Sequence, residues 1–155
     1  MGCDIHAFAE RRTESGAYEF IELDDPPFDV RSYGLFAFLA GVRNYSDIQP
    51  LAEIRGCPDD ASDYVKVERD DWEYDGHSHS WLSIDELLAF DYDSFTEDRR
   101  VTQRMPGGWI DCAATADPGD GKQTTYRNFL GQWFFEELNR LKESKVDRVV
   151  FWFDN

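Results

Sequence analysis

The chain has 155 residues, of which 32 are acidic and 16 are basic, so its formal net charge is −16. A surface of this charge repels DNA, RNA and anionic membranes, which argues against a conventional nucleic-acid-binding or membrane-bound protein. Aromatic residues make up 15% of the chain, which is enough for a hydrophobic core and argues against intrinsic disorder. We therefore expect one folded domain over residues 1–155.

Two β-prone runs open the chain, at residues 3–10 and 17–23, and a short polar loop around Gly16 separates them. This arrangement predicts a β-hairpin. Two consecutive prolines follow the second run and end it, because proline cannot donate to a strand ladder. Residues 33–42 then carry apolar side chains at helical spacing, which predicts a first helix.

Two more helices are expected in the middle of the chain. One covers residues 61–74, with Asp59–Asp60 as its cap. Its inward-facing side chains are expected to be Tyr64, Val67 and Trp72. Ser83 and Glu86 have the spacing of a capping box, in which each side chain binds the other residue's backbone N–H, so residues 84–90 are predicted to be helical.

The rest of the chain divides into three parts. Residues 91–123 are rich in glycine turns and predict a loop with one short strand at 109–112. Residues 125–143 carry the longest apolar helical stripe. Residues 146–153 are apolar on both faces, which is typical of a central buried strand. The expected fold is α+β: a small, mainly antiparallel sheet built from the N-terminal hairpin and the C-terminal strand, covered by helices.

The cellular location is predicted from what the sequence lacks. No apolar run approaches the roughly 20 residues that span a bilayer, and the N-terminus has no basic segment followed by an apolar one. The cysteines are odd in number and widely spaced, which favours free thiols in a reducing compartment. They are Cys3, Cys57 and Cys112. We expect a protein of the cytoplasm.

All three histidines lie in two short motifs, Asp4-Ile-His6 and His77-Ser-His79. Residues two apart on a strand point to the same face, so each motif would project its two polar side chains together. If the motifs faced each other, three imidazoles and one carboxylate would form a site suited to Zn, Mn or Fe. A metal in such a site lowers the pKa of bound water to about 7 and supplies a nucleophile. The candidate catalytic carboxylates nearby are Asp75 and Asp154.

The histidine motifs also have a structural interpretation. An Asp-x-His match occurs often by chance, and a His-x-His segment among glycine and serine is as readily a solvated turn that leads into the Ser83 capping box. Because the two motifs contain every histidine of the chain, the metal site carries more weight than either motif would alone.

A second candidate site is Arg43-Asn44-Tyr45, which follows the first predicted helix. Arginine can bind a phosphate and tyrosine can stack on a base, so the segment predicts a site for a small anionic ligand such as a nucleotide. The alternative is a helix C-terminus that uses Arg and Asn for capping. Trp81 could form a wall of the same kind of pocket, or it could serve as a hydrophobic staple beside the capping box.

Three segments resemble a family of small, mostly uncharacterised proteins of tailed bacteriophages. They are the opening Met1–His6, the segment Gly76–Leu82 and the ending Val150–Asn155. The resemblance spans both ends and the middle of the chain. It implies a phage-encoded protein that acts in the cytoplasm of the bacterial host, and it implies no activity. Small phage proteins of this kind often counter host defences by binding or cleaving nucleotide signals or by blocking an effector.

Three functions are therefore open. The first is a metal-dependent hydrolase of a phosphoester or nucleotide, with Asp4, His6, His77 and His79 as metal ligands and Arg43 on the phosphate. The second is a non-enzymatic protein that sequesters a nucleotide signal. The third is an acidic decoy that binds a host protein through its charged surface.

Overall fold

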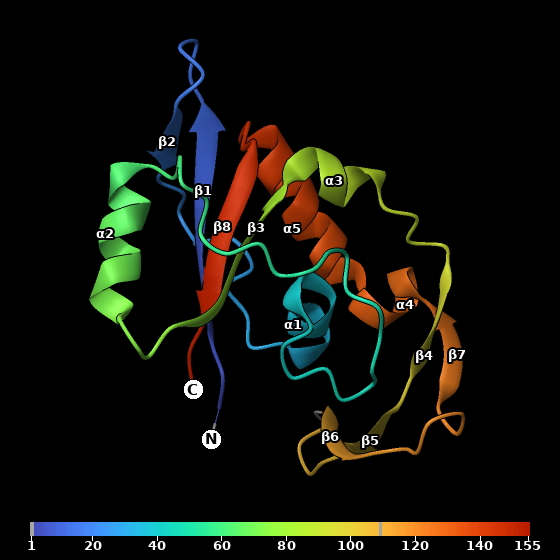
Figure 1. The fold of residues 1–155 in the computed structure, drawn as a ribbon. Helices are drawn as coiled ribbons and strands as arrows, with labels where there is room; N and C mark the ends of the chain where they lie inside the picture. Colours follow the sequence, from blue (N-terminus) through green and yellow to red (C-terminus); the bar gives the residue numbers. More distant parts are fainter. Residues whose placement is uncertain (1, 109) are drawn as a thin grey trace.

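The computed structural model describes residues 2–108 and 110–155 (Figure 1). Its strands are β1 (Ile5–Arg12), β2 (Tyr18–Ile21), β3 (His77–Ser83), β4 (Phe95–Asp98), β5 (Arg100–Arg104), β6 (Ile110–Thr115), β7 (Lys122–Thr125) and β8 (Arg148–Phe153). Its helices are α1 (Tyr33–Ala40), α2 (Asp63–Trp72), α3 (Ile84–Ala89), α4 (Tyr126–Leu130) and α5 (Gln132–Glu143).

The centre of the fold is a four-stranded antiparallel sheet in the order β2-β1-β8-β3. Helix α2 packs on one face, and α1, α3 and α5 lie on the other (Figure 1). The predicted α+β fold, with a sheet built from the N-terminal hairpin and the C-terminal strand, is confirmed. Strand β3 extends this sheet on its other side, and both chain termini lie at the same end of it (Figure 1).

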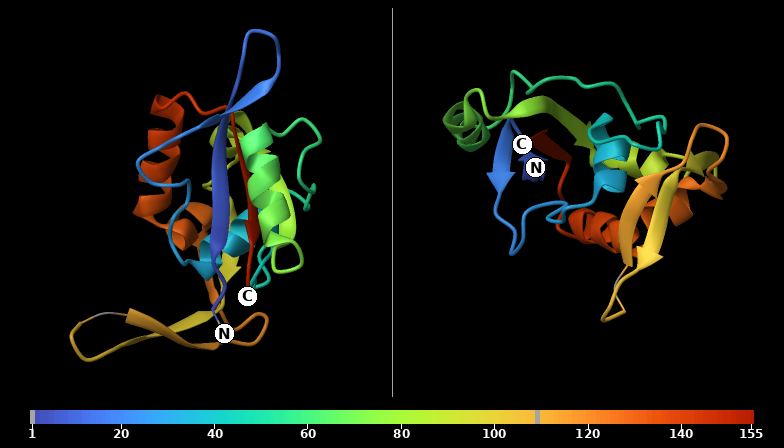
Figure 2. Two further views of the ribbon diagram at one scale, coloured as in Figure 1. Left: turned by 90° about the vertical axis from the view of Figure 1, so that its left-hand side faces the viewer. Right: turned by 90° about the horizontal axis from the view of Figure 1, so that it is seen from below.

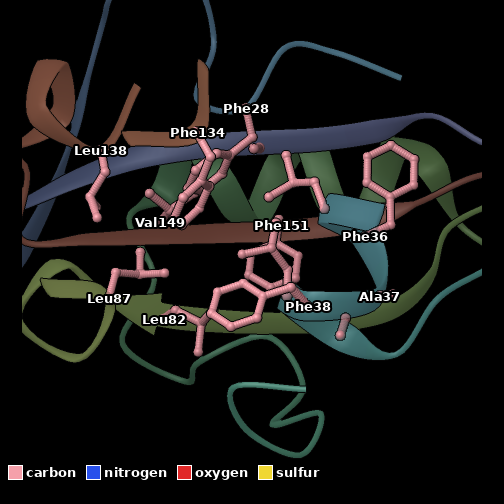
Figure 3. Packing of buried hydrophobic residues seen from close by; sticks show 14 of the residues in the cluster. Phe28, Phe36, Ala37, Phe38, Leu82, Leu87, Phe134, Leu138, Val149 and Phe151 are labelled. Carbon is pink, nitrogen blue, oxygen red and sulfur yellow. The ribbon is translucent and has the colours of Figure 1, made fainter. Parts of the chain in front are cut away.

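Strand β8 is the core of the molecule, and all six of its residues are buried. Alternate side chains serve the two faces: Val149, Phe151 and Phe153 join the larger core, while Val150 and Trp152 pack under α2. Figure 3 shows the larger core between β8 and the helices, with Phe151 near Phe38 and Leu82. Burial on both faces explains why the segment lacks the polar–apolar alternation of a surface strand.

Local signals set the ends of the helices. Ser32 caps α1 through the N–H of Leu35, and Gly41 ends it in the left-handed conformation at φ 69°. The predicted capping box of Ser83 and Glu86 is present at the start of α3. Helix α2, however, is capped by Ser62 rather than by Asp59–Asp60, and it covers Asp63–Trp72 rather than residues 61–74.

The inward face of α2 differs from the prediction in two of its three residues. Val65 is the buried residue of this helix, whereas Tyr64 and Val67 are 49% and 59% exposed. Val65 packs with Val150 and Trp152 of β8, and Tyr64 turns aside to stack on Phe20. Trp72 is half-buried against the sheet, as expected.

Two other expectations are corrected. Gly131, at φ 83°, breaks the single helix predicted over 125–143 into α4 and α5. The segment 91–123 forms four strands, paired as the two-stranded ribbons β4–β7 and β5–β6, rather than a loop with one strand. These strands are short and mostly polar, so they lack the apolar alternation that marks a strand in sequence. The predicted strand at 109–112 falls within β6 except for Trp109, which lies outside the described residues.

A buried ion pair joins α2 to the sheet. Arg148 of β8 donates from Nε to Glu10 Oε1 at 2.6 Å, and both side chains are almost completely buried. The other carboxylate oxygen of Glu10 accepts from the N–H of Ser62, the cap of α2. The guanidinium carbon of Arg148 also lies 3.5 Å from the centroid of the Tyr18 ring. This network fixes where α2 begins on the sheet.

Candidate functional site: an arginine- and tyrosine-lined pocket

A cavity of about 470 Å³ lies where α1, the loop after it, the β5–β6 ribbon and α4 meet. Its volume falls within the range of small-molecule binding sites, roughly 300–1,000 Å³. Its lining combines arginines, aromatic rings and small polar residues. These are Arg31, Ser32, Tyr33, Gly34, Ala37, Arg43, Asn44, Tyr45, Ser46, Arg100, Ala114, Thr115 and Phe129. The predicted segment Arg43-Asn44-Tyr45 thus lies in the wall of this pocket.

The loop that carries Arg43 and Tyr45 is held by its own hydrogen bonds. Asn44 donates from its side-chain amide to the carbonyl of Ile48 at 2.8 Å and accepts from the N–H of Ile48 at 3.0 Å. Arg43 itself has a positive φ of 52°, which turns the chain directly after α1. Asn44 therefore shapes the loop, and its neighbours Arg43 and Tyr45 are the residues presented to the pocket.

Arg43 and the two tyrosines form one aromatic and cationic group. Arg43 Nη1 donates to the hydroxyl of Tyr45 at 3.1 Å, and this hydrogen bond raises the pKa of Arg43. Its guanidinium carbon lies 5.5 Å from the centroid of the Tyr33 ring, within cation–π range. The hydroxyl of Tyr33 accepts from the backbone N–H of Cys3, which fixes the ring from the other side.

Arg100 forms the opposite part of the lining, from the start of β5. Its guanidinium binds both carboxylate oxygens of Asp98 at 2.9 Å and stacks 4.1 Å from the centroid of the Phe129 ring. A Cβ added to Gly34 would come within 2.7 Å of Arg100 Nη1. Glycine at this position in the first turn of α1 therefore allows the arginine to approach the helix.

Arg31 completes the basic lining, and it engages a residue expected elsewhere. Its guanidinium donates to both oxygens of Asp4, at 2.8 and 2.6 Å, and holds the pKa of Asp4 below its usual range. Asp4 was predicted to share a metal site with His6. In the structure its carboxylate points to Arg31 instead.

The partner of His6 is Asp154. His6 Nε2 lies 2.8 Å from Asp154 Oδ2, and each side chain is 24% exposed. The other oxygen of Asp154 accepts from the backbone N–H of Asp4, so the carboxylate is held in place. The ring of His6 packs on Trp72 of α2 with a centroid separation of 4.0 Å. The histidine and one predicted catalytic carboxylate are thus brought together at the end of the sheet.

His77 and His79 do not project together. Ser78 between them has a positive φ of 55°, and the register of β3 against β8 shifts between His77 and Ser80. This bulge turns His77 toward Phe153 and Asn155, while His79 stacks on Trp152 on the α2 face of the sheet. Burial, followed by the charge of Arg69, lowers the pKa of His79. The expectation of a shared face fails because the motif is bulged.

The described residues contain no group of three or more His, Cys, Asp or Glu side chains placed to hold a metal ion. His6 and His79 share a face, but their strands flank β8, and two strand spacings amount to about 9–10 Å. The indole of Trp152 lies on the strand between them. Asp75, the other predicted catalytic residue, is exposed in the turn after α2.

Trp81, predicted as a possible pocket wall, packs against guanidinium groups away from the arginine pocket. Its ring lies 4.6 Å from Arg55 and 5.8 Å from Arg148. The residues that sequence analysis missed are Arg31, Tyr33, Arg100 and Phe129. They come from three separate segments of the chain, and no spacing in the sequence links them to Arg43.

Comparisons of the chain with protein-family models, with curated proteins and with solved structures found no match. Within the described residues, no helix is both long enough and apolar enough to cross a membrane. The resemblance to bacteriophage proteins and the location in the cytoplasm stay predictions. The pocket geometry is therefore the basis for a functional assignment.

Proposed function

We propose that the protein binds a small anionic ligand that carries an aromatic ring, of the nucleotide class, in the pocket around Arg43. The observation that carries this proposal is the lining of a single cavity by three arginines, Arg31, Arg43 and Arg100, together with aromatic residues. Guanidinium groups bind phosphate through paired hydrogen bonds, and tyrosine and phenylalanine rings stack on bases.

The charge of the protein supports a small ligand over a polymer. A net charge of −16 repels an extended polyanion, whose many phosphates would meet the acidic surface. A single nucleotide enters one local pocket and interacts mainly with the groups that line it, because salt screens charges more than about 8–10 Å away. Arg43, whose pKa is raised by Tyr45, stays cationic under all ordinary conditions.

The test is calorimetric titration of the purified protein with mononucleotides and dinucleotides. We expect Arg43→Ala to weaken binding by at least about tenfold, because it removes a charge-assisted contact. Arg127→Ala is the control, since Arg127 is, like Arg43, an arginine within cation–π range of an aromatic ring, but it pairs with Asp93 and lies outside the pocket lining. The proposal would be contradicted if both variants lost affinity equally, or if the parent protein itself bound no nucleotide.

The fate of the ligand separates binding from hydrolysis. Sequestration predicts that chromatography of the released ligand recovers it intact after prolonged incubation. With the predicted phage origin, such a protein would remove a nucleotide signal of the host defence without turnover. Appearance of a cleaved product would favour an enzyme.

Metal-dependent hydrolysis of a phosphoester is the second candidate, and one observation favours it: His6 binds Asp154 and shares a sheet face with His79. Only His6 and Asp154 lie within contact distance of each other, so a Zn, Mn or Fe ion would bind to this pair, and His79 would have to move toward it to become a third ligand. Elemental analysis of the untagged protein beside a His6→Ala/His79→Ala variant tests it. Near-stoichiometric metal that is lost in the variant supports the hydrolase, and a protein that stays metal-free after incubation with these ions excludes the site.

A further inference from the structure

Half of strand β1 lacks a neighbour on one side. Strand β2 pairs with β1 only over Ala9–Arg12, so the segment Ile5–Phe8 has β8 on one side and no strand on the other. The chain leaves β2 after Ile21 and passes beside β1 on its way to α1 (Figure 2, left). An open strand edge of this kind is a template for pairing with another chain.

The hydrogen-bond pattern shows which backbone groups face the open side. Asp154 donates from its N–H to the carbonyl of Asp4, so Asp4, His6 and Phe8 direct their backbone groups toward β8. Because the direction alternates along an antiparallel strand, the N–H and C=O groups of Ile5 and Ala7 point away from β8. Within the described part of the chain, no side chain donates to or accepts from these groups, and Ala7 is only 5% exposed. Backbone N–H and C=O groups that are so little exposed normally have a hydrogen-bond partner.

A groove runs along this open edge. Two cavities of about 390 and 280 Å³ lie end to end beside β1, and they share Ala7, Phe8, Pro26 and Pro27 in their lining. The prolines form the wall opposite the strand and offer no N–H that would compete for its carbonyls. The smaller cavity also has the stacked pair Phe20 and Tyr64 in its lining, with ring centroids 4.0 Å apart.

The rim of the groove is acidic. Glu22 lines the smaller cavity and Asp29 the larger one, and both are exposed. Asp24 and Asp25 lie exposed on the segment between them. Arg31 is the basic residue of the groove lining, and Asp4 binds it in a bidentate ion pair. The unpaired backbone therefore lies beside a cluster of carboxylates.

We propose that this groove binds an extended, basic peptide segment of a partner protein, which adds a strand to the sheet beside Ile5–Ala7. Backbone hydrogen bonds to Ile5 and Ala7 would give the affinity, and alternate side chains would give the specificity. One set of side chains, apolar, would enter the cavity beside Phe20 and Tyr64, and the neighbouring lysines or arginines would meet Glu22 and Asp29. A second copy of this chain is a poor occupant, because each copy carries a charge of −16 and would bring a like-charged rim to the interface.

The experiment titrates the whole protein with a peptide of alternating valine and lysine, about eight residues long, which is the length of an ordinary strand. Amide NMR shifts and hydrogen exchange follow binding. We expect the amides of Ile5 and Ala7 to gain protection from exchange, while those of His6 and Phe8, already paired with β8, change little. The same peptide with N-methyl groups on alternate amides keeps its charge and loses the donors on one edge, so it should not bind when the methylated edge faces β1.

Charge is tested with a pair of matched variants. Glu22→Gln/Asp29→Asn removes two rim carboxylates and should weaken binding by about fivefold at low salt, with the difference fading as salt rises. Asp117→Asn/Asp120→Asn removes two exposed carboxylates that are not in the groove lining and should leave affinity unchanged. All four side chains are exposed, so the fold is retained in both variants.

Several results would overturn the proposal. One is the absence of binding at millimolar peptide, and another is equal binding of the peptides methylated on either edge. The others are protection at amides outside Ile5–Ala7 and an equal loss of peptide affinity in the two charge variants. A dimer seen by light scattering, with protection of the same amides, would assign the groove to a second copy and also refute it. The nucleotide pocket is tested separately, because none of these four substitutions lies in its lining.

Discussion

Strand β8 and the β5–β6 ribbon are both antiparallel, yet they differ in almost every other respect. All six residues of β8 are buried between layers of helices, whereas four of the five residues of β5 are exposed. The ribbon projects from the body of the protein (Figure 2). The candidate pocket draws one wall from the helical layer and the other from the base of this ribbon. Stability and binding are therefore assigned to different parts of the chain.

The largest contrast is expected for side-chain truncation in the two regions. Phe151→Ala in β8 should lower the free energy of unfolding by about 3–5 kcal/mol, because it removes a buried ring and leaves a cavity. Val101→Ala in β5 should change it by less than about 0.5 kcal/mol, because Val101 is 45% exposed. Urea denaturation of both variants makes the comparison, and a similar cost in the two would refute it.

The buried ion pair gives the next contrast. Arg148→Ala should cost about 3–5 kcal/mol, because it leaves Glu10 buried without its cation. Arg148→Met/Glu10→Leu removes both charges and should recover most of that loss. Thermal unfolding of the single and double variants measures both the loss and the recovery of stability. If Arg148→Ala were as stable as the parent, the carboxylate of Glu10 would not depend on Arg148, and the prediction would be refuted.

Nucleotide binding should be sensitive to substitutions in the loop after α1 that carries Arg43 and Tyr45. Asn44→Ala removes both hydrogen bonds to Ile48 and should lower nucleotide affinity several-fold by freeing Arg43 and Tyr45 from their positions. The same variant should lower the free energy of unfolding by about 1 kcal/mol, which is the usual net contribution of an intramolecular hydrogen bond. Calorimetric titration measures the affinity and urea denaturation measures the stability. An unchanged nucleotide affinity would show that this loop takes no part in binding.

The smallest expected effect is pH-dependent. Arg55 lowers the pKa of Glu86 from 4.5 to about 2, so the folded state favours the ionised carboxylate. A depressed carboxylate pKa stabilises the fold fully above pH 4.5 and progressively less as the pH falls toward 2. Because the pair is partly exposed, the loss should be about 1 kcal/mol. Unfolding of Arg55→Ala between these pH values should show a flatter dependence than the parent, and parallel curves would contradict the assignment.

Much of the fold could be predicted from local signals. The hairpin, the capping box of Ser83 and the buried strand β8 all follow from short-range patterns, and each is present. The break at Gly131 and the polar ribbons escaped prediction. A glycine within an apolar helical stripe is often tolerated, and short strands composed mostly of polar residues carry no apolar alternation.

The candidate site could be predicted only in part. Arg43 and Tyr45 were identified because they follow a helix end, but Arg100 and Phe129 join them through packing of distant elements. The histidine motifs were extended to a metal site on the assumption of regular strands. The bulge at Ser78 separates His77 from His79, and a single residue with positive φ is enough to do so.

The sequence by itself determined the helices and strands with strong local signals, the burial of β8 and the acidic character of the surface, because these depend on composition and on neighbours along the chain. Only the tertiary structure decided which residues meet. It paired His6 with Asp154 and Asp4 with Arg31, gathered three arginines around one pocket and left the edge of β1 open. Contacts of this kind depend on how elements pack and where strands end, and residue spacing along the chain does not encode them directly.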